Sequence, residues 1–209
     1  MRYLDRTATS PPACLARYLN DPNADWEELS KNKADYREVC AALAALQGSR
    51  CAYCDCDLQR ESDHPHIEHF VQRRRRPGRT FDWSNLFWSC SHEACCGKHK
   101  DNHAGAYADA DLLKPDADQP RDFLCFSDDG RVWPKNGSRM GAETIRVFAL
   151  DCARLRGIRR SYLSSLAGEL EQMAQAGLSN AELIDYKKAL ASEWQQQPFY
   201  SAVLDVLGL

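Results

Sequence analysis

The sequence has no long apolar run and no recognisable export signal. No window of its 209 residues approaches 18 uncharged apolar residues, which excludes a membrane-spanning helix. The first residues, Met1-Arg-Tyr-Leu-Asp5, are not followed by the apolar core of a signal peptide. We therefore expect a cytoplasmic protein without membrane contact. In that reducing compartment, clustered cysteines are more often metal ligands than disulfides.

The chain also lacks an excess of positive charge. Its 27 basic and 30 acidic residues leave a net charge of −3, whereas a dedicated nucleic-acid binder usually has a basic excess. The local pattern differs, because five arginines fall within one short stretch: Arg73, Arg74, Arg75, Arg76 and Arg79. Such a run is either a solvated loop or a phosphate-binding segment. We favour phosphate contact, because the run lies inside the candidate site described next.

Histidine is absent from most of the chain. All six histidines fall between His64 and His103, and six of the ten cysteines lie between Cys51 and Cys96. Histidine and cysteine are the side chains that bind zinc most often in proteins. Their concentration in one segment predicts a metal site there.

Two groups of cysteines have the spacing of a structural zinc site. Cys51 and Cys54 form a Cys-x-x-Cys turn, and Cys90 with Cys95 or Cys96 supplies a second pair. The alternative is a thioredoxin-like redox pair, which would require a βαβ context and no second cysteine group. We therefore expect a structural Zn²⁺ held by these two pairs.

Between the two cysteine groups lies the segment His66-Ile-Glu68-His69. In a strand, His66 and Glu68 share one face and His69 lies on the other. A histidine beside a carboxylate can act as a general base for water while the carboxylate holds a divalent cation on a phosphate. His-x-Glu also occurs in zinc deaminases, but there the Cys-x-x-Cys pair follows it, whereas here it precedes it. The segment therefore favours phosphodiester chemistry.

Outside this segment the pattern is mainly helical. Apolar spacing predicts a helix from Asp25 to a stop at Gly48, and continuous helical structure beyond Gly141, with the capping box Ser179-Asn-Ala-Glu182 opening a further helix. Two apolar runs joined by Asp-Gly within residues 122–133 predict a β-hairpin. We divide the chain into a helical N-terminal arm (1–48), a metal-rich module (49–106), and a hairpin with a C-terminal helical domain (107–209). The expected fold class is α+β and mainly helical.

Four segments resemble an HNH endonuclease: Cys51-Ala-Tyr-Cys54, Ile67-Glu68-His69-Phe70, Asn85-Leu-Phe-Trp-Ser-Cys90 and Cys96-Gly-Lys-His-Lys-Asp101. More narrowly, they are similar to the PtuB family of Septu antiphage systems and its retron-associated relatives. The resemblance extends into the C-terminal half through Leu112-Leu-Lys-Pro-Asp116 and Phe126-Ser-Asp-Asp-Gly130. It thus covers nearly the whole chain.

The resemblance implies that the metal-rich module is a zinc-stapled ββα-metal (HNH) module. His69 would be the general base, Glu68 would replace a metal-binding aspartate, and Asn85 would brace the loop that orients His69. The resemblance also favours Cys96 over Cys95 as the fourth zinc ligand.

One position departs from the family pattern. Many HNH enzymes have a histidine or asparagine directly after the last zinc cysteine, where this chain has Gly97. His99 is the best substitute, with His103 or Asp101 behind it. On this basis Glu68 and His99 would hold a catalytic Mg²⁺ or Mn²⁺.

The expected function is metal-dependent hydrolysis of nucleic-acid phosphodiester bonds. DNA is the expected substrate, and RNA such as a tRNA loop is the alternative, because the sequence does not separate them. The resemblance adds a PtuA-type ATPase partner and a role as the nuclease effector of antiphage defence. A rival hypothesis is a non-catalytic zinc module that docks on nucleic acid or on the ATPase. Such a module would keep the zinc cysteines but would not require His69.

Overall fold

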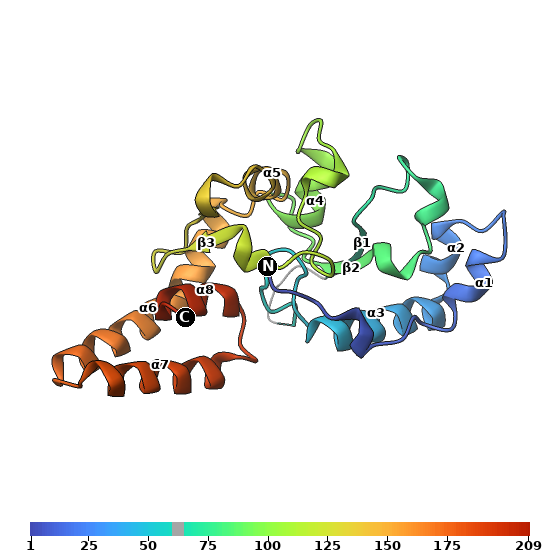
Figure 1. Cartoon of the computed structure of the whole chain (residues 1–209). Coiled ribbons are helices and arrows are strands. Elements are labelled where there is room, and N and C mark those ends of the chain that lie inside the picture. The colour runs from blue at the N-terminus through green and yellow to red at the C-terminus, as the bar shows by residue number, and fades with distance from the viewer. Residues whose placement is uncertain (60–64) are drawn as a thin grey trace.

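The computed structural model describes residues 1–59 and 65–209, so that His64 lies outside the described residues. Short helices and two small sheets make up the described part, which is α+β and mainly helical, as predicted (Figure 1). In chain order the helices and strands are α1 (Leu15–Leu19), α2 (Trp26–Lys31), α3 (Lys33–Gln47), β1 (His66–His69), β2 (Leu86–Ser89), α4 (Cys96–Asn102), β3 (Leu124–Phe126), β4 (Val132–Pro134), α5 (Arg139–Val147), α6 (Ala153–Gln175), α7 (Asn180–Trp194) and α8 (Tyr200–Leu207). Among the described residues, no helix combines the length and the apolar character that a membrane crossing requires.

The predicted helix from Asp25 to Gly48 is in fact two helices, α2 and α3. Asn32 ends the first and caps the second, because its side chain accepts hydrogen bonds from the main-chain nitrogens of Ala34 and Asp35. The apolar spacing continues across this cap, so periodicity alone did not show the break. Gly48 ends α3 with a φ of 59°, a left-handed conformation that glycine adopts without strain.

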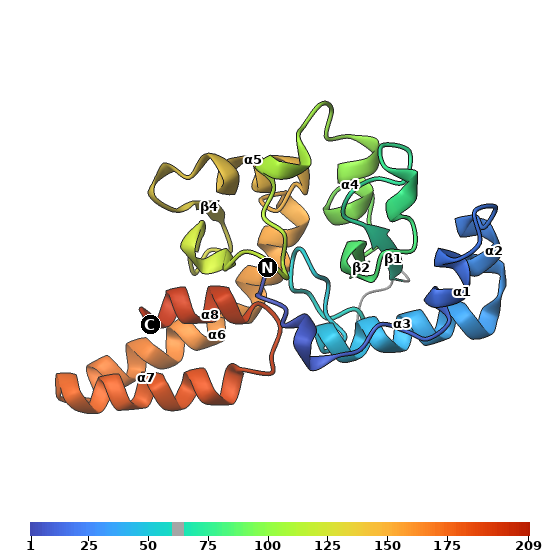
Figure 2. The same cartoon turned by 45° about the vertical axis from the view of Figure 1, so that its right-hand side comes forward.

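The hairpin of β1 and β2 lies between α3 and α4 (Figures 1 and 2). The strands are antiparallel, with His66 opposite Ser89 and His69 opposite Leu86. Apolar side chains of α3 and of the strands share one core, in which Val39, Leu43 and Leu86 are fully buried. Burying a side chain of this kind contributes about 1.5–3 kcal/mol, so α3 forms a firm base under the strands that carry the site.

The C-terminal half contains the predicted hairpin and helices. β3 and β4 pair antiparallel, and the capping box of Ser179 and Glu182 is formed at the start of α7. The predicted continuous helical stretch is interrupted between α5 and α6, where Ala149 has a φ of 46°. A second core extends from the cysteine-rich segment to α8 and contains Tyr53 stacked on Phe148 at 4.0 Å. The metal-rich segment is therefore packed directly against the C-terminal helices.

Candidate metal centre and candidate active site

The structure brings together the four cysteines favoured as zinc ligands. The sulfur atoms of Cys51, Cys54, Cys90 and Cys96 all lie within 4.8 Å of one another, and all four side chains are buried. Zinc–sulfur bonds of about 2.3 Å give a tetrahedral edge of about 3.8 Å. The distance of 4.0 Å between the sulfurs of Cys51 and Cys90 is close to that value. The donor set therefore fits one tetrahedral metal ion with no open position.

Two further cysteines lie beside this cluster. The sulfur of Cys56 is 3.2 Å from that of Cys54, and the sulfur of Cys95 is 3.8 Å from that of Cys90. Neither belongs to the group in which every sulfur is close to every other. The geometry thus groups Cys96, and not Cys95, with the other three cysteines.

The start of α4 joins the cysteine cluster to the strand that carries Glu68. The Gly97 main-chain nitrogen donates a hydrogen bond to Ser89 Oγ at 3.2 Å. A Cβ atom added at Gly97 would lie 2.2 Å from Cγ of Glu68, closer than any side chain could tolerate. The absence of a side chain at position 97 therefore allows the Glu68 carboxylate to approach the helix. The departure from the usual HNH pattern has a packing reason in this chain.

The Glu68 carboxylate is buried beside a lysine. Its Oε1 lies 2.5 Å from Nζ of Lys100, and both side chains are shielded from solvent. The Oε2 atom is also shielded and accepts no hydrogen bond from any described residue. Burial raises the pKa of Glu68 to about 7, although the ammonium group of Lys100 opposes this shift. Oε2 is therefore the oxygen of Glu68 that is available to a cation.

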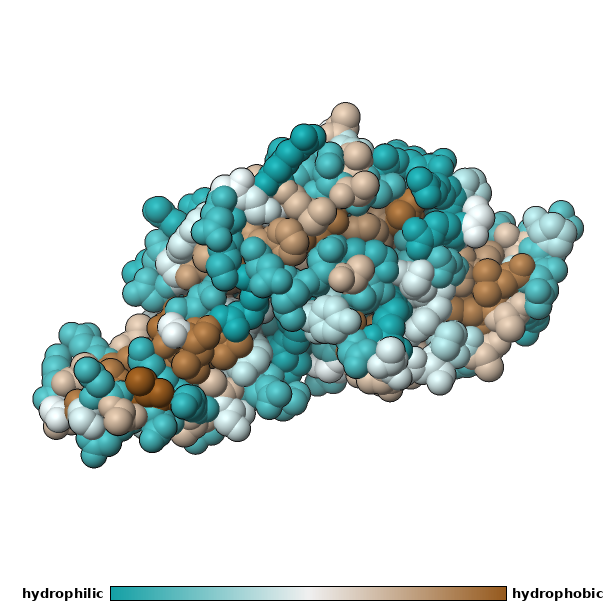
Figure 3. All heavy atoms as spheres, in the orientation of Figure 1, coloured by the Kyte–Doolittle hydropathy of each residue, from teal (hydrophilic) through white to brown (hydrophobic). Residues whose placement is uncertain are grey.

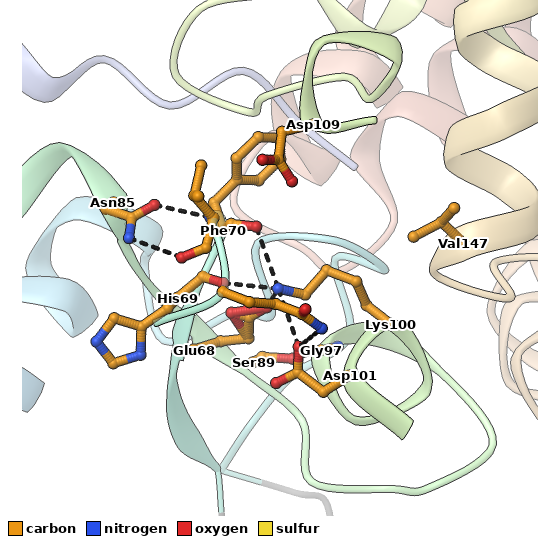
Figure 4. Close-up of polar contacts among 12 residues, drawn as sticks. Glu68, His69, Phe70, Asn85, Ser89, Gly97, Lys100, Asp101, Asp109 and Val147 are labelled. Carbon is orange, nitrogen blue, oxygen red and sulfur yellow. Dashed lines mark hydrogen bonds and ion pairs between the residues drawn. The ribbon is translucent and has the colours of Figure 1, made fainter. Parts of the chain in front are cut away.

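Lys100 is held in place by main-chain carbonyl groups. Its ammonium group donates hydrogen bonds to the carbonyl oxygens of His69 at 2.6 Å and Phe70 at 3.1 Å (Figure 4). It also lies 3.2 Å from Oδ1 of Asp101. Lys100 therefore fixes the end of β1 and supplies a positive charge at the bottom of the site.

His69 lies on the opposite side of β1 from Glu68. In Figure 4 the Glu68 side chain points toward Gly97 and Lys100, whereas the His69 ring points away from them. Ring nitrogen Nε2 lies 2.9 Å from the carbonyl oxygen of Thr80 and therefore donates its proton to it. The other ring nitrogen of the neutral imidazole is then free to accept a proton. Burial lowers the pKa of His69 to about 4, so the ring is neutral at pH 7.

Asn85 braces the loop that follows β1. Its Oδ1 accepts a hydrogen bond from the Val71 nitrogen at 2.8 Å, and its Nδ2 donates to the Val71 carbonyl oxygen at 3.0 Å (Figure 4). Nδ2 also donates to the carbonyl oxygen of Arg79 at 3.0 Å. Asn85 is fully buried, so these bonds are protected from water. Arg79 is next to Thr80, whose carbonyl oxygen accepts the proton of His69. The amide therefore supports the group that orients the imidazole.

Glu68 and His69 both line one cleft of about 650 Å³, which we call the His69 cleft. Side chains from α2, β1, α4 and residues 73–79, which we call the arginine loop, border it. They include Trp26, Glu68, His69, Arg73, Lys98 and Asp101. His66, the third member of the His-x-Glu-His segment, also lines it, and burial lowers its pKa. The cleft thus gathers a carboxylate, a neutral imidazole and several cations, the groups that phosphate chemistry needs.

His99 does not line this cleft. Its Nδ1 lies 2.9 Å from the carbonyl oxygen of Val147 in α5, and its ring contacts that of His103 at 5.8 Å. On α4 the residues that border the cleft are Lys98, Asp101 and Asn102. The structure therefore does not bring His99 together with Glu68, and of the substitutes considered, only Asp101 is present in the cleft.

The five arginines fall into two groups. Arg75 pairs with Asp109 at 2.7 Å and Arg79 with Asp82 at 2.8 Å. No described carboxylate lies within ion-pair distance of Arg73, Arg74 or Arg76, which are exposed. Arg73 and Arg74 line the His69 cleft. Phosphate contact therefore fits the second group better than the first.

Sequence reasoning missed Trp26, which lines the His69 cleft, and Lys100, which is buried beside Glu68. Lys100 was read only as part of a motif, although its position four residues after Cys96 places it on the same side of a helix. Trp26 was read as the start of a core helix, but its ring meets that of His69 edge-on at 4.4 Å. It lies 43 positions before His69 in the sequence. No local pattern could connect residues so far apart.

No protein-family model matches the chain. Three curated proteins are similar to it. "Septu protein PtuB" of Bacillus thuringiensis is 31% identical over 83 residues, which cover 40% of this chain and 30% of that protein. "Septu protein PtuB" of Bacillus mycoides (strain KBAB4) is 28% identical over 135 residues, covering 52% and 45%. "Retron Ec83 putative HNH endonuclease" of Escherichia coli is 26% identical over 186 residues, covering 68% and 72%.

The matched segments span less than half the length of either Septu relative. The match to the retron protein covers about two thirds or more of both chains. All three names agree with the resemblance seen in the motifs. At identities of 26–31%, the chain is similar to proteins named as PtuB and as a putative HNH endonuclease.

Proposed function

We propose that this chain is an HNH endonuclease that hydrolyses nucleic-acid phosphodiester bonds with the help of a divalent metal ion. The observation that carries the proposal is the pairing, in one cleft, of a neutral His69 and a Glu68 carboxylate with an unpartnered oxygen. The names of the relatives support the same activity class.

His69 would take the proton from the attacking water. Its Nε2 proton is bound to the carbonyl oxygen of Thr80, so the remaining ring nitrogen is the acceptor. A phosphodiester anion in the cleft would stabilise the imidazolium ion and raise the low pKa of His69 toward neutrality. Asn85 keeps the acceptor in place through the loop that it braces.

Glu68 would hold the divalent ion, Mg²⁺ or Mn²⁺, through the oxygen that Lys100 does not pair. When bound, such an ion neutralises charge that develops on the phosphate and the leaving oxygen. Lys100 keeps the carboxylate from being left unpaired in the protein interior. Arg73 and Arg74 would bind the phosphates on either side without reading the bases.

The zinc ion would have a purely structural role at the cysteine cluster. The cluster holds the start of α4 against β2, and α4 in turn carries Gly97 and Lys100 to Glu68. A closed set of four thiolates leaves no position for substrate. The two metals would thus divide between folding and chemistry.

Incubation of purified protein with plasmid DNA, single-stranded DNA and total tRNA tests the activity. We expect cleavage with Mg²⁺ or Mn²⁺, no cleavage without a divalent ion, and none by His69→Ala. A variant that cuts as fast as the parent would remove His69 from the mechanism. Binding without cleavage in all conditions would favour the non-catalytic zinc module.

We further propose that the nuclease acts with a PtuA-type ATPase in antiphage defence. Two relatives bear the name of a Septu protein, which supports this assignment. Co-expression with a neighbouring ATPase should give a complex that is stable on size exclusion. Full cleavage by the chain alone, with no effect of the ATPase, would leave a free-standing nuclease.

A further inference from the structure

The His69 cleft continues into a second hollow on each side of the arginine loop. One hollow of about 570 Å³, which we call the Phe81 hollow, shares Trp26, Arg73 and Arg74 with the cleft. The other, of about 520 Å³, which we call the Tyr107 hollow, shares Arg74 and Asp101 with it. Three adjoining hollows with His69 in the middle one form a path that an extended chain could follow on both sides of the reacting groups.

Trp26 stands where the His69 cleft meets the Phe81 hollow. Its ring is partly exposed, contacts the edge of the His69 ring at 4.4 Å and lies 6.1 Å from the ring of Phe81. The guanidinium group of Arg73 lies 5.8 Å from the centre of the same ring. An aromatic ring and an exposed cation with no carboxylate partner among the described residues therefore lie together next to the proposed base. Apolar side chains also gather near α1 on the face shown in Figure 3, and Leu19 at the end of α1 is 56% exposed beside the Phe81 hollow.

The reacting groups are recessed. Glu68 is 1% exposed and His69 is 7% exposed at the bottom of the cleft. One wall is formed by Trp26 and Tyr36 of α2 and α3, and the other by Lys98 and Asp101 of α4. A phosphate must enter between these walls to reach His69. An unpaired strand can bend to do so, whereas a stacked and paired duplex would first have to be distorted.

The charge of the path also suits a single strand. Arg75 and Arg79 are paired with aspartates, which leaves Arg73, Arg74 and Lys98 as the cations that border the His69 cleft. Duplex binders make many phosphate contacts on two strands. Proteins that bind unpaired strands instead combine a cationic groove with aromatic rings on which bases stack. The combination of few cations and one partly exposed tryptophan corresponds to the second type.

We propose that the substrate is unpaired at the cleavage point and that Trp26 stacks the base next to the scissile phosphate. This inference rests on the proposed nuclease function and names its substrate class. The Tyr107 hollow receives the strand on the other side of His69. DNA and RNA strands share the chemistry that this path recognises, because every base offers an aromatic face.

Binding is measured with the His69→Ala protein, so that any effect of Trp26 on the orientation of His69 cannot contribute. The probes are a fluorescent single-stranded oligonucleotide, as DNA and as RNA, and the matching DNA duplex. We expect tighter binding to the single strands. Trp26→Ala should weaken that binding about tenfold or more while changing duplex binding by less than about twofold. Trp26→Phe, which keeps a ring, should restore most of the affinity.

Trp133 is the matched control, because it is 45% exposed on β4 and does not line the path. Trp133→Ala should bind like its parent. Equal binding to duplex and single strand, or a Trp26→Ala loss shared by all probes, overturns the proposal. Cleavage of the same probes by the protein with His69 intact separates the two ideas. Single-strand binding without cleavage removes the nuclease function, whereas equal cleavage of duplex and single strand keeps that function and removes the strand preference.

Discussion

The cysteine cluster and the His69 cleft are neighbouring regions, of which the first is closed and the second is open. The cluster gathers four buried thiols within 4.8 Å of one another, a donor set that fits one metal ion and leaves it no open coordination position. The cleft has about 650 Å³ of open space, one carboxylate oxygen without a partner and one imidazole nitrogen without a proton. Closed metal sites stabilise folds and open ones perform chemistry. The same segment of chain thus builds both kinds of site from different residue types.

The two regions are joined through α4. The cluster fixes the start of α4, and α4 places Gly97 and Lys100 against Glu68. The four cysteines themselves do not line the cleft. Changes in the cluster should therefore abolish both folding and activity, whereas changes in the cleft should reduce activity alone.

The largest effect is expected for the cysteines of the cluster. Cys51→Ser or Cys90→Ser should lose zinc and unfold or aggregate, because structural zinc contributes about 10–16 kcal/mol in small zinc-binding peptides. Cys95→Ser is the control, since its sulfur lies outside the group of four, and it should stay folded with zinc bound. Metal analysis and thermal unfolding measure both outcomes. Folded, zinc-free Cys51→Ser protein would show that the cluster is not structural.

A change in the cleft should separate activity from folding. His69→Ala should lower the cleavage rate by about 10²–10⁴, the usual contribution of a general base, with zinc content and Tm unchanged. His99→Ala tests whether His99 is a metal ligand, as the sequence suggested, or lies outside the site, as in the structure. Because His99 bonds to Val147 outside the cleft, its loss should affect the rate far less than the loss of His69. Comparable losses of cleavage rate in both variants would indicate that His99 does take part in the metal site.

The pKa of Glu68 predicts how the metal requirement depends on pH. Burial raises this pKa to about 7, and only the ionised carboxylate can bind a cation. The metal concentration for half-maximal cleavage should therefore rise as pH falls below about 7, approaching tenfold per pH unit. Protonation of His69, whose pKa burial lowers to about 4 in the free protein, would change the maximal rate, so the half-maximal metal concentration is the quantity compared. A metal requirement that is constant from pH 8 to pH 5.5 would exclude Glu68 as the ligand.

The arginines should give the smallest effect, on affinity alone. Replacing Arg73 and Arg74 with serine removes two unpaired cations and should reduce the salt slope of binding by roughly 1.5 on every sequence. Replacing Arg75 and Arg79, which are paired with aspartates, is the matched control and should leave the slope nearly unchanged. Binding titrations from about 50 to 200 mM salt measure the difference. Equal slopes in both variants and the parent would restore the solvated-loop interpretation.

Local patterns in the sequence were sufficient for much of the fold. The hairpin of β3 and β4 and the Ser179 capping box are confirmed, because each depends on residues only a few positions apart. The break at Asn32 was missed because one helix ends and the next begins there while the apolar spacing continues unchanged.

Contacts between distant segments could not be read from the sequence. The approach of Glu68 to Gly97 depends on how β1 lies against α4, which no spacing rule encodes. The same is true of Trp26 beside His69. The metal-binding roles of the individual residues stay predictions.

The most direct measurement combines metal content with activity in one preparation. Protein dialysed against metal-free buffer is analysed for zinc and then assayed for nucleic-acid cleavage as Mg²⁺ or Mn²⁺ is added. The account predicts about one tightly held zinc per chain, no cleavage before the addition, and cleavage that rises with added ion while zinc stays constant. Folded protein without zinc, or cleavage that does not depend on the added ion, would contradict it.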